Sequence, residues 1–302
     1  GTYKYHLDSV WDKWDDGTYD LVTDPSKHTA ANGYDYQESG DIAFTFFASG
    51  TYRLYFHVMD MDGPPYSTER IIVNVTVSDP GYPSISAVAD SVAAECLAAG
   101  NATDFDKALW LHDWVIDRCA YDNSYLYCGA EGALARGTGT CESYHRAYVM
   151  LLSRVGIDTG RITGNGHVWT AVKMDGEWYQ VDATWDDEKE ISGYPDLRHL
   201  HFGLNDAITS LVHSDHAPNA GYESNSLEDN YFIKTDEIAQ WSDPYASQIQ
   251  GKLDAGETVF SVPISHESWP SSYKNVLYNL IAYDLGGRSW TIGSDLVRVI
   301  VS

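Results

Sequence analysis

The chain has 302 residues, 43% of them hydrophobic, with 22 tyrosines and 10 tryptophans. This composition is typical of a folded protein, and the length is sufficient for two or three domains. Asp and Glu outnumber Lys and Arg by 44 to 19, and the net charge of −25 argues against binding to nucleic acid or anionic lipid. We find no apolar run near the ~20 residues that a transmembrane helix requires, so we expect no transmembrane segment.

Composition also bears on the cellular location of the protein and on whether its cysteines form disulfides. Low lysine content and many tyrosine, asparagine, serine and threonine residues favour a secreted or cell-surface protein, whose signal peptide is not part of this chain. The four cysteines neither prove nor exclude an oxidising compartment. Cys119 and Cys128 flank a short loop, so a disulfide between them and two reduced thiols are both compatible with the sequence.

Residues 1–80 have the alternating pattern of β-strands. The clearest runs are residues 41–60, interrupted by the turn signal Ser49-Gly50, and residues 69–79. A second turn signal, Asp-Gly-Pro-Pro at 62–65, separates these runs. Several short strands without a helical segment predict an immunoglobulin-like β-sandwich.

The pattern changes at residues 79–83, where the run Asp-Pro-Gly-Tyr-Pro predicts a domain boundary. Beyond it, an alanine-rich segment at 84–99 predicts one helix. A segment at 103–119 that opens on Thr-Asp-Phe-Asp predicts a capped second helix. A glycine-rich segment at 137–140, which we interpret as flexible, then leads to Cys141.

Cys141 is predicted to begin a third helix. Ala147, Met150 and Leu151 follow it at helical spacing, and Gly156 is a suitable stop. At a helix start, unpaired backbone N–H groups and the positive end of the helix dipole favour a thiolate over a thiol. The thiolate is the nucleophilic form of cysteine, so this position suits a nucleophile.

A β-hairpin is predicted next. Residues 167–174 and 177–185 alternate on either side of Asp175-Gly176, and Asp-Gly between alternating runs is a strong hairpin signal. The two-residue loop fixes the register, with Met174 opposite Glu177.

This register brings His167 and Asp182 to the same face as diagonal neighbours, within reach of a side-chain hydrogen bond. The opposite face carries apolar residues that we expect in the core: Val168, Val172, Met174, Tyr179, Val181 and Ala183. One face of the hairpin is therefore expected to be buried and the other to present a His–Asp pair.

Four histidines follow the hairpin: His199, His201, His213 and His216. His213 and His216 have a spacing that suits two metal ligands on one helical face. We favour a structural role for them, because no Cys or Glu joins them at ligand spacing, and we expect no metal. The C-terminal pattern predicts a helix at 236–253, a strand at 257–264, a helix at 271–285 and a strand at 296–302.

Three motifs together carry a family resemblance: Gly-x-Gly-x-Cys at 137–141, His-x-Trp at 167–169 and Asp-Ala-Thr-Trp at 182–185. About residues 84–240 resemble the transglutaminase-like superfamily of papain-type thiol enzymes, in its bacterial, secreted, multidomain form. The resemblance implies a papain-like α+β core. It also implies an acyl-enzyme that passes to water or to an amine.

Residue by residue, the resemblance implies Cys141 as the nucleophile, His167 as the general acid and base, and Asp182 as the group that orients the imidazole. The backbone N–H of Cys141 is expected to stabilise the oxyanion. Tyr121 and Tyr125 are the candidates for a second donor.

Trp169 and Trp185 complete the candidate site as residues near the substrate. We expect a protease or amidase that acts on protein or peptide substrates, with cell-wall and host surface proteins as candidates, and that needs no cofactor. Hydrolysis is favoured over crosslinking, because the acidic calcium-site clusters of animal crosslinking enzymes are not recognisable. The alternative is an inactive cell-surface binding or scaffold protein that keeps the fold.

The predicted architecture is an α+β multidomain chain. Residues 1–80 form the immunoglobulin-like sandwich, residues 84–234 the transglutaminase-like catalytic core, and residues 235–302 a small α/β accessory domain.

Overall fold

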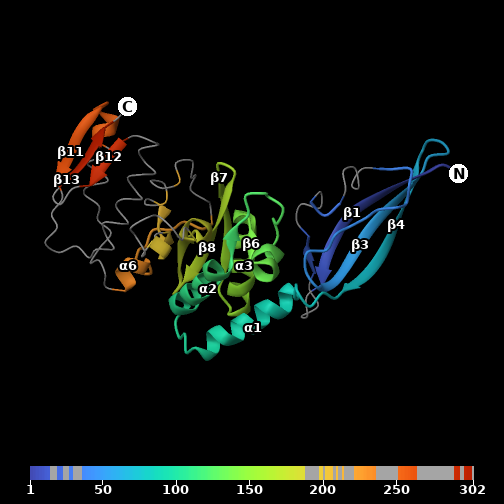
Figure 1. Cartoon of the computed structure of the whole chain (residues 1–302), viewed down its shortest axis with the longest axis horizontal. Helices are drawn as coiled ribbons and strands as arrows, with labels where there is room; N and C mark the ends of the chain where they lie inside the picture. The colour runs from blue at the N-terminus through green and yellow to red at the C-terminus, as the bar shows by residue number, and fades with distance from the viewer. Residues whose placement is uncertain are drawn as a thin grey trace. The chain divides into compact units, whose positions relative to one another are not determined.

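The computed structural model describes residues 1–13, 19–22, 27–29, 36–187, 197–199, 201–206, 209, 213, 221–235, 251–263, 289–292 and 296–300. The chain has mixed α/β structure (Figure 1). It divides into two compact units: Gly1–Ala102 with Trp110–Gly156, and Thr103–Leu109 with Ile157–Ser302. The three predicted domains stay a prediction.

The first unit opens with an antiparallel four-stranded sheet (Figure 1). In sheet order, its strands are β2 (Tyr19–Leu21), β1 (Tyr3–Lys13), β3 (Gly50–Asp60) and β4 (Ser67–Val77). Its core is made by Leu7, Val10, Tyr52 and Leu54. The predicted turn at 62–65 joins β3 to β4. Strand β4 confirms the strand predicted at 69–79.

Residues 41–48 are not the strand that the alternation predicts. Within them, Phe44 makes only an isolated bridge, to Thr29, and Ser49-Gly50 leads into β3 rather than joining two strands. The alternating side chains Ile42 and Phe44 nevertheless pack on the sheet core. The alternation of apolar residues at 41–48 therefore reflects burial of their side chains and not a paired strand. The immunoglobulin-like sandwich stays a prediction.

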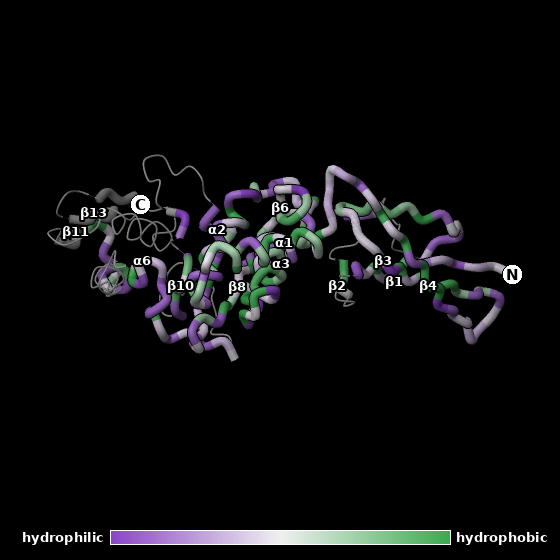
Figure 2. Tube along the Cα trace, turned by 90° about the horizontal axis from the view of Figure 1, so that it is seen from below, coloured by the Kyte–Doolittle hydropathy of each residue, from purple (hydrophilic) through white to green (hydrophobic). Residues whose placement is uncertain are grey.

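Three helices follow, all as predicted: α1 (Ile85–Ala98), α2 (Asp104–Arg118) and α3 (Cys141–Arg154). Thr103 caps α2, because its Oγ1 accepts the N–H of Asp106 at 3.0 Å while the Asp106 carboxylate accepts the N–H of Thr103 at 3.2 Å. Helix α1 packs against α3, and Figure 2 shows hydrophobic residues along both. Cys96 of α1 and Leu151 of α3 are fully buried.

The second unit contains an antiparallel sheet. In sheet order, its strands are β10 (Phe202–Leu204), β9 (Glu177–Val181), β8 (His167–Met174) and β7 (Thr159–Gly164). Met174 faces Glu177 as predicted, and Asp175 and Gly176 both have positive φ, 49° and 98°, as a tight hairpin turn requires. The six apolar residues predicted for one face are all buried.

The hairpin prediction fails at its end. Strand β9 stops at Val181 and is followed by the short helix α4 (Ala183–Asp186), where the sequence pattern predicted a strand to residue 185. The other face of β8 is also more apolar than expected, since Trp169 and Ala171 are buried there against Tyr222. The sheet is therefore covered on both faces.

The rest of the second unit contributes the 3₁₀ turn η3 (Leu197–His199), α6 (Tyr231–Lys234) and the strands β11 (Val259–Pro263), β12 (Ser289–Ile292) and β13 (Leu296–Ile300). These last strands form an antiparallel sheet in the order β11-β13-β12. The predicted strands at 257–264 and 296–302 are confirmed. Residues 236–250 and 271–285, where helices were predicted, lie outside the described residues.

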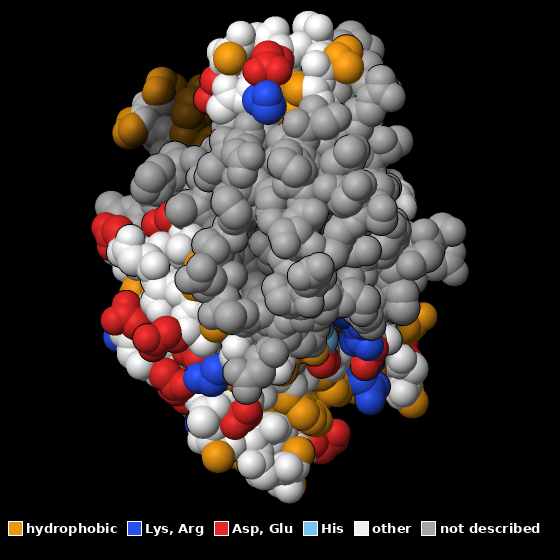
Figure 3. Space-filling model, turned by 90° about the vertical axis from the view of Figure 1, so that its left-hand side faces the viewer, with side chains coloured by type: hydrophobic (Ala, Val, Ile, Leu, Met, Phe, Trp, Pro, Cys, Tyr) orange, Lys and Arg blue, Asp and Glu red, His pale blue; other side chains and the backbone are white. Residues whose placement is uncertain are grey.

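Among the helices of the described residues, none is both long and apolar enough to cross a membrane. On the face shown in Figure 3, acidic side chains gather along one edge of the described surface. This agrees with the net charge of −25.

Candidate active site

Cys141 is the first residue of α3, as predicted. Thr140 precedes it as the N-cap in an extended conformation, with φ −81° and ψ 176°. The carbonyl of Thr140 accepts the N–H of Ser143 at 2.8 Å and that of Tyr144 at 3.2 Å. The sulfur-bearing residue therefore lies in the first turn, where the helix dipole favours negative charge.

The glycines before Cys141 belong to defined elements of structure, which the sequence did not predict. Gly137, with φ 68°, ends the π-helical turn η2 (Gly132–Arg136), and Thr138–Gly139 form β6. A Cβ on Gly139 would lie 2.3 Å from Cβ of Ser143 on the facing turn of α3. Glycine is needed here because the backbone approaches the helix too closely for any side chain.

Tyr121 lies beside this helix start. Strand β5 (Ala120–Tyr121) pairs in parallel with β6, with Tyr121 opposite Gly139. Burial, followed by the electrostatic effect of Cys141 and then of Tyr125, raises the pKa of Tyr121 to about 12. The rings of Tyr121 and Tyr125 meet edge to face at 6.5 Å. Both candidate oxyanion donors therefore belong to the same unit as Cys141.

The loop that carries Tyr125 is held by Asp122, which is buried. The Asp122 carboxylate accepts three backbone N–H groups, from Ser124, Leu126 and Tyr127, at 2.8 to 2.9 Å. Burial alone would raise the pKa of Asp122, but these bonds and the Ser124 hydroxyl lower it. The Tyr127 carbonyl in turn accepts the Thr140 N–H at 3.0 Å, which ties the loop to the start of α3.

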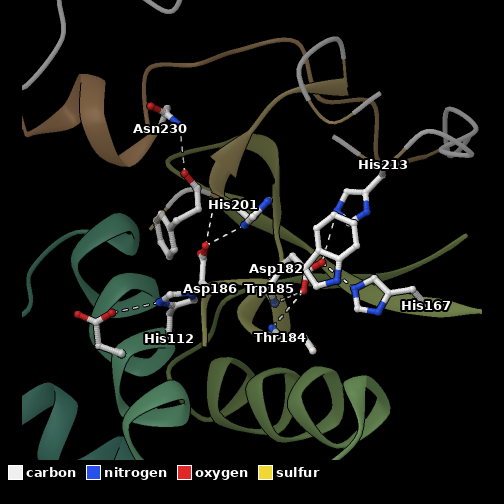
Figure 4. A network of polar contacts seen from close by, with 11 residues as sticks. His112, His167, Asp182, Thr184, Trp185, Asp186, His201, His213 and Asn230 are labelled. Carbon is white, nitrogen blue, oxygen red and sulfur yellow. Dashed lines mark hydrogen bonds and ion pairs between the residues drawn. The ribbon is translucent and has the colours of Figure 1, made fainter. Parts of the chain in front are cut away.

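His167 and Asp182 form the predicted pair in the second unit (Figure 4). His167 Nε2 lies 2.7 Å from Asp182 Oδ2, and the side chains are 15% and 2% exposed. The route differs from the prediction, because Asp182 is not a strand residue but the N-cap of α4. Its Oδ1 accepts the N–H groups of Thr184 and Trp185 at 3.0 and 3.2 Å.

Electrostatics keep Asp182 ionised. Burial by itself raises the pKa of the carboxyl, but the neighbouring His167 and His213 and their hydrogen bonds hold this pKa well below its usual range. An ionised carboxylate only accepts hydrogen bonds, so Nε2 of His167 is the donor. Nδ1 is then the basic nitrogen of the neutral ring, the one that takes up a proton.

His213 joins this pair, which the sequence did not predict. Its Nε2 lies 3.3 Å from the same Oδ2 of Asp182. Its ring is stacked between Trp169, at 4.1 Å and 5°, and Trp185, at 4.0 Å and 25°. The position of His213 among four histidines was visible in the sequence, but its spacing along the chain does not give its distance from the hairpin.

Two further histidines of this segment, His199 and His201, are also engaged. His201 Nδ1 lies 3.0 Å from Asp186 Oδ1, and both side chains are buried. His199 stacks on Tyr231 at 4.0 Å. His216 lies outside the described residues, so its predicted spacing with His213 has no structural test.

Trp169 and Trp185, the residues expected near the substrate, surround the pair. Trp185 stacks on His167 with ring centres 5.1 Å apart. Trp169 is 2% exposed, and its indole N–H donates to Gln180 Oε1 at 2.7 Å. The Gln180 amide continues this chain to the carboxylate of Asp206. These contacts give Trp169 a clear role in holding the site.

The cysteines settle the alternative that the sequence left open. None of the four forms a disulfide, so Cys119 and Cys128 are not bridged. Cys96 and Cys119 are buried, whereas Cys128 and Cys141 are half-buried.

Comparison with known proteins identifies the central part of the chain. Residues 90–183 match the family model of the transglutaminase-like superfamily, and this range contains Cys141, His167 and Asp182. The match supports similarity of residues 90–183 to the transglutaminase-like superfamily. Within the matched range, Cys141 belongs to the first unit, and His167 and Asp182 belong to the second.

Matches to whole proteins are sparse. No curated protein matches the chain. Among solved structures, the chain matches a crystal structure of a TGase at 16% identity, with a TM-score of 0.31. The match covers 33% of this chain and spans about a third of that TGase chain, 32%. At that TM-score the similarity supports no conclusion about fold or activity.

Proposed function

We propose that the chain is a cysteine enzyme that cleaves protein or peptide amide bonds, or transfers their acyl group, through a thioester on Cys141. The observation that carries the proposal is the 2.7 Å contact of His167 Nε2 with a buried, ionised Asp182 inside a transglutaminase-like domain. Such a contact sets the imidazole tautomer that a general base needs.

The proposed reaction has two halves. The Cys141 thiolate attacks the amide carbon, and the C–N bond breaks as the imidazolium of His167 gives its Nδ1 proton to the departing amine. Neutral His167 then takes a proton from water or from a second amine, which attacks the thioester and releases the Cys141 thiolate. Asp182 stays ionised throughout and stabilises the imidazolium.

Each half of the reaction passes through a tetrahedral intermediate whose oxyanion requires hydrogen-bond donors. The backbone N–H of Cys141 is the first donor that we propose, because it lies at the start of α3. The Tyr121 hydroxyl is the second, supported by its electrostatic interaction with Cys141 and by a raised pKa that keeps it protonated. Trp185, stacked on His167, is proposed to border the acyl group.

Selective alkylation tests the proposal. The protein is treated with iodoacetamide between pH 5.5 and 8.5, and each cysteine is followed by peptide mass spectrometry. Cys128 is the internal control, because it is half-buried like Cys141. We expect Cys141 to react at least about tenfold faster than Cys128 at pH 6.5, since a thiol of ordinary pKa is mostly protonated there.

The same experiment on His167→Ala tests whether the two parts of the domain form one site. The Cys141 rate at pH 6.5 should fall to that of Cys128, while the Cys128 rate stays unchanged. A Cys141 that reacts like Cys128 in the parent protein, or that is indifferent to His167→Ala in a folded variant, would overturn the proposal. The result would then favour a binding or scaffold protein.

Hydrolysis and transfer are separated by an assay with glutaminyl peptides. Ammonia release without an added amine measures hydrolysis, and peptide–amine adducts in the presence of cadaverine measure transfer. We propose hydrolysis as the main reaction. Adduct formation in excess of hydrolysis at millimolar amine would reverse that preference.

We also propose roles for residues 1–80 and 235–302 and a cellular location for the protein. Residues 1–80 are proposed as an immunoglobulin-like module, supported by the antiparallel sheet and its core of Leu7, Val10, Tyr52 and Leu54. Residues 235–302 are proposed as an accessory domain, supported by the β11–β13 sheet. The composition supports a secreted or cell-surface setting, which fractionation of the producing cell would test.

A further inference from the structure

Asp182 accepts hydrogen bonds from four groups. Oδ1 receives the N–H groups of Thr184 and Trp185, and Oδ2 faces Nε2 of both His167 and His213 (Figure 4). Because the carboxylate is ionised and cannot donate, both imidazoles carry hydrogen on Nε2. The two rings therefore share one oxygen.

His213 is held more rigidly than a surface histidine. It is 4% exposed and lies between two indoles, with the Trp169 ring almost parallel to it. The Trp169 indole N–H donates to Gln180 Oε1, and the backbone N–H of Trp185 donates to Asp182 Oδ1. The distance from His213 to Oδ2 is thus set by packing.

His213 also adds no positive charge to the pair. Burial lowers its pKa, although Asp182 acts in the opposite direction. Among the described residues, the titratable groups that face it are Asp182, His167 at 5.8 Å and His201 at 6.2 Å between ring centres. A neutral donor on Oδ2 stabilises the carboxylate without repelling a proton on His167.

We propose that His213 is a positioning residue that holds Asp182 and sets the proton affinity of His167. His213 and His167 both donate to Oδ2 of Asp182. The bond from His213 reduces the negative charge that this oxygen offers to His167, so the carboxylate stabilises protonated His167 less. The catalytic meaning of this role rests on the proposed function, but the effect on His167 does not depend on Cys141.

Nuclear magnetic resonance of ¹⁵N-histidine protein measures this effect directly. In the parent protein, we expect hydrogen on Nε2 of His213. In His213→Phe, which keeps an aromatic ring between the indoles but has no donor, the pKa of His167 should rise by about half a unit. In His213→Gln, whose amide can donate to Oδ2, most of this rise should disappear.

A purely structural role predicts different results. His213 protonated on Nδ1 alone in the parent protein would overturn the proposal, and this measurement needs no variant. A folded His213→Phe protein with an unchanged His167 pKa would also overturn it. Failure of Cys141 to show enhanced alkylation while His167 shifts as expected would instead count against the proposed function alone.

A second inference concerns the first unit and is independent of the first. His6 and His57 are directly opposite each other on β1 and β3, and Asp8 lies at the irregularity between Leu7 and Ser9. One ligand atom from each of His6, Asp8 and His57 lies within 4.8 Å of the other two. Leu7 is fully buried on the core side, so these polar side chains share the outer face.

Two imidazoles and one carboxylate are a donor set that suits Zn²⁺, with a fourth position for water. Ligand atoms about 2.1 Å from a tetrahedral ion are about 3.4 Å apart. The His57 Nδ1 to Asp8 Oδ1 distance is 4.0 Å, and these side chains are 29% and 39% exposed. Small rotations of accessible side chains therefore suffice to close the site.

We infer that His6, Asp8 and His57 bind a divalent transition-metal ion such as Zn²⁺. The full chain, freed of metal with a chelator, is titrated with Zn²⁺ by calorimetry and with Co²⁺ by absorption. We expect one equivalent of micromolar affinity that weakens at least about tenfold in His57→Ala and Asp8→Asn. Asp41→Asn, which changes an exposed carboxylate outside the cluster, is the control and should bind like the parent.

The outcomes are distinct. Equal binding by the parent protein and both variants would overturn the inference, as would the absence of binding at micromolar Zn²⁺. Cobalt absorption of tetrahedral intensity that is lost in His57→Ala would support it.

Discussion

Asp182 Oδ2 lies 2.7 Å from His167 Nε2, while the other oxygen of the same carboxylate caps α4. One side chain therefore orients the imidazole and ends the hairpin. The cap also explains why Asp182 points at His167 although β9 stops one residue earlier.

Substitutions of Asp182 should separate these two roles. Asp182→Asn keeps an oxygen for the cap but places an N–H donor against Nε2 of His167, which favours the wrong imidazole tautomer. We expect a fall in turnover on the order of 10³-fold with modest loss of stability. Asp182→Ala should also lower the free energy of unfolding by about 3 kcal/mol, because buried donors lose their acceptor.

Peptide hydrolysis and chemical denaturation check this pair of variants. Asp186→Asn is the matched control, since Asp186 is an equally buried carboxylate that pairs with His201 instead. Equal losses of turnover in Asp182→Asn and Asp186→Asn would contradict a specific role for Asp182.

Tyr121→Phe tests the second oxyanion donor. Removal of one donor from an oxyanion hole lowers kcat by about 10² to 10³-fold, so we expect a loss of that order with little change in KM. Tyr125→Phe is the control, because Tyr125 contacts the Tyr121 ring and should matter less. A Tyr121→Phe protein with unchanged kcat would remove Tyr121 from the site.

Gly139→Ala should damage the start of α3. The added Cβ would meet Cβ of Ser143 at 2.3 Å, so the backbone before Cys141 must move. We expect a lower melting temperature and slower alkylation of Cys141. The double variant Gly139→Ala/Ser143→Gly removes the colliding atoms and should recover part of both losses; no recovery would place the cause elsewhere.

The pKa of His213 predicts how stability depends on pH. A pKa that is lowered on folding makes a contribution that is fully present above the unfolded value of about 6.5 and is lost as pH falls from there through the lower pKa of the folded state. The free energy of unfolding should therefore decrease from pH 7.5 to pH 5.5. Urea denaturation of His213→Phe should show a smaller decrease than the parent, and an identical slope would contradict the prediction.

A good part of the candidate site follows from the sequence because its determinants are local. The apolar spacing after Cys141 and the stop at Gly156 placed Cys141 at the start of α3. The Asp-Gly turn fixed the register of β8 and β9, which brings His167 near Asp182 across only a few residues of strand. Local geometry of this kind needs no knowledge of the rest of the fold.

Only the tertiary structure decided the features that depend on distant segments. The sequence predicted a continuing strand at Asp182, because alternation cannot show that a carboxylate will cap a helix turn. It did not predict why glycine is needed at 139, because close approach to Ser143 has no local pattern. His213 reaches Asp182 from outside the hairpin, and the packing of Trp169 and Trp185, rather than any spacing in the chain, brings it there.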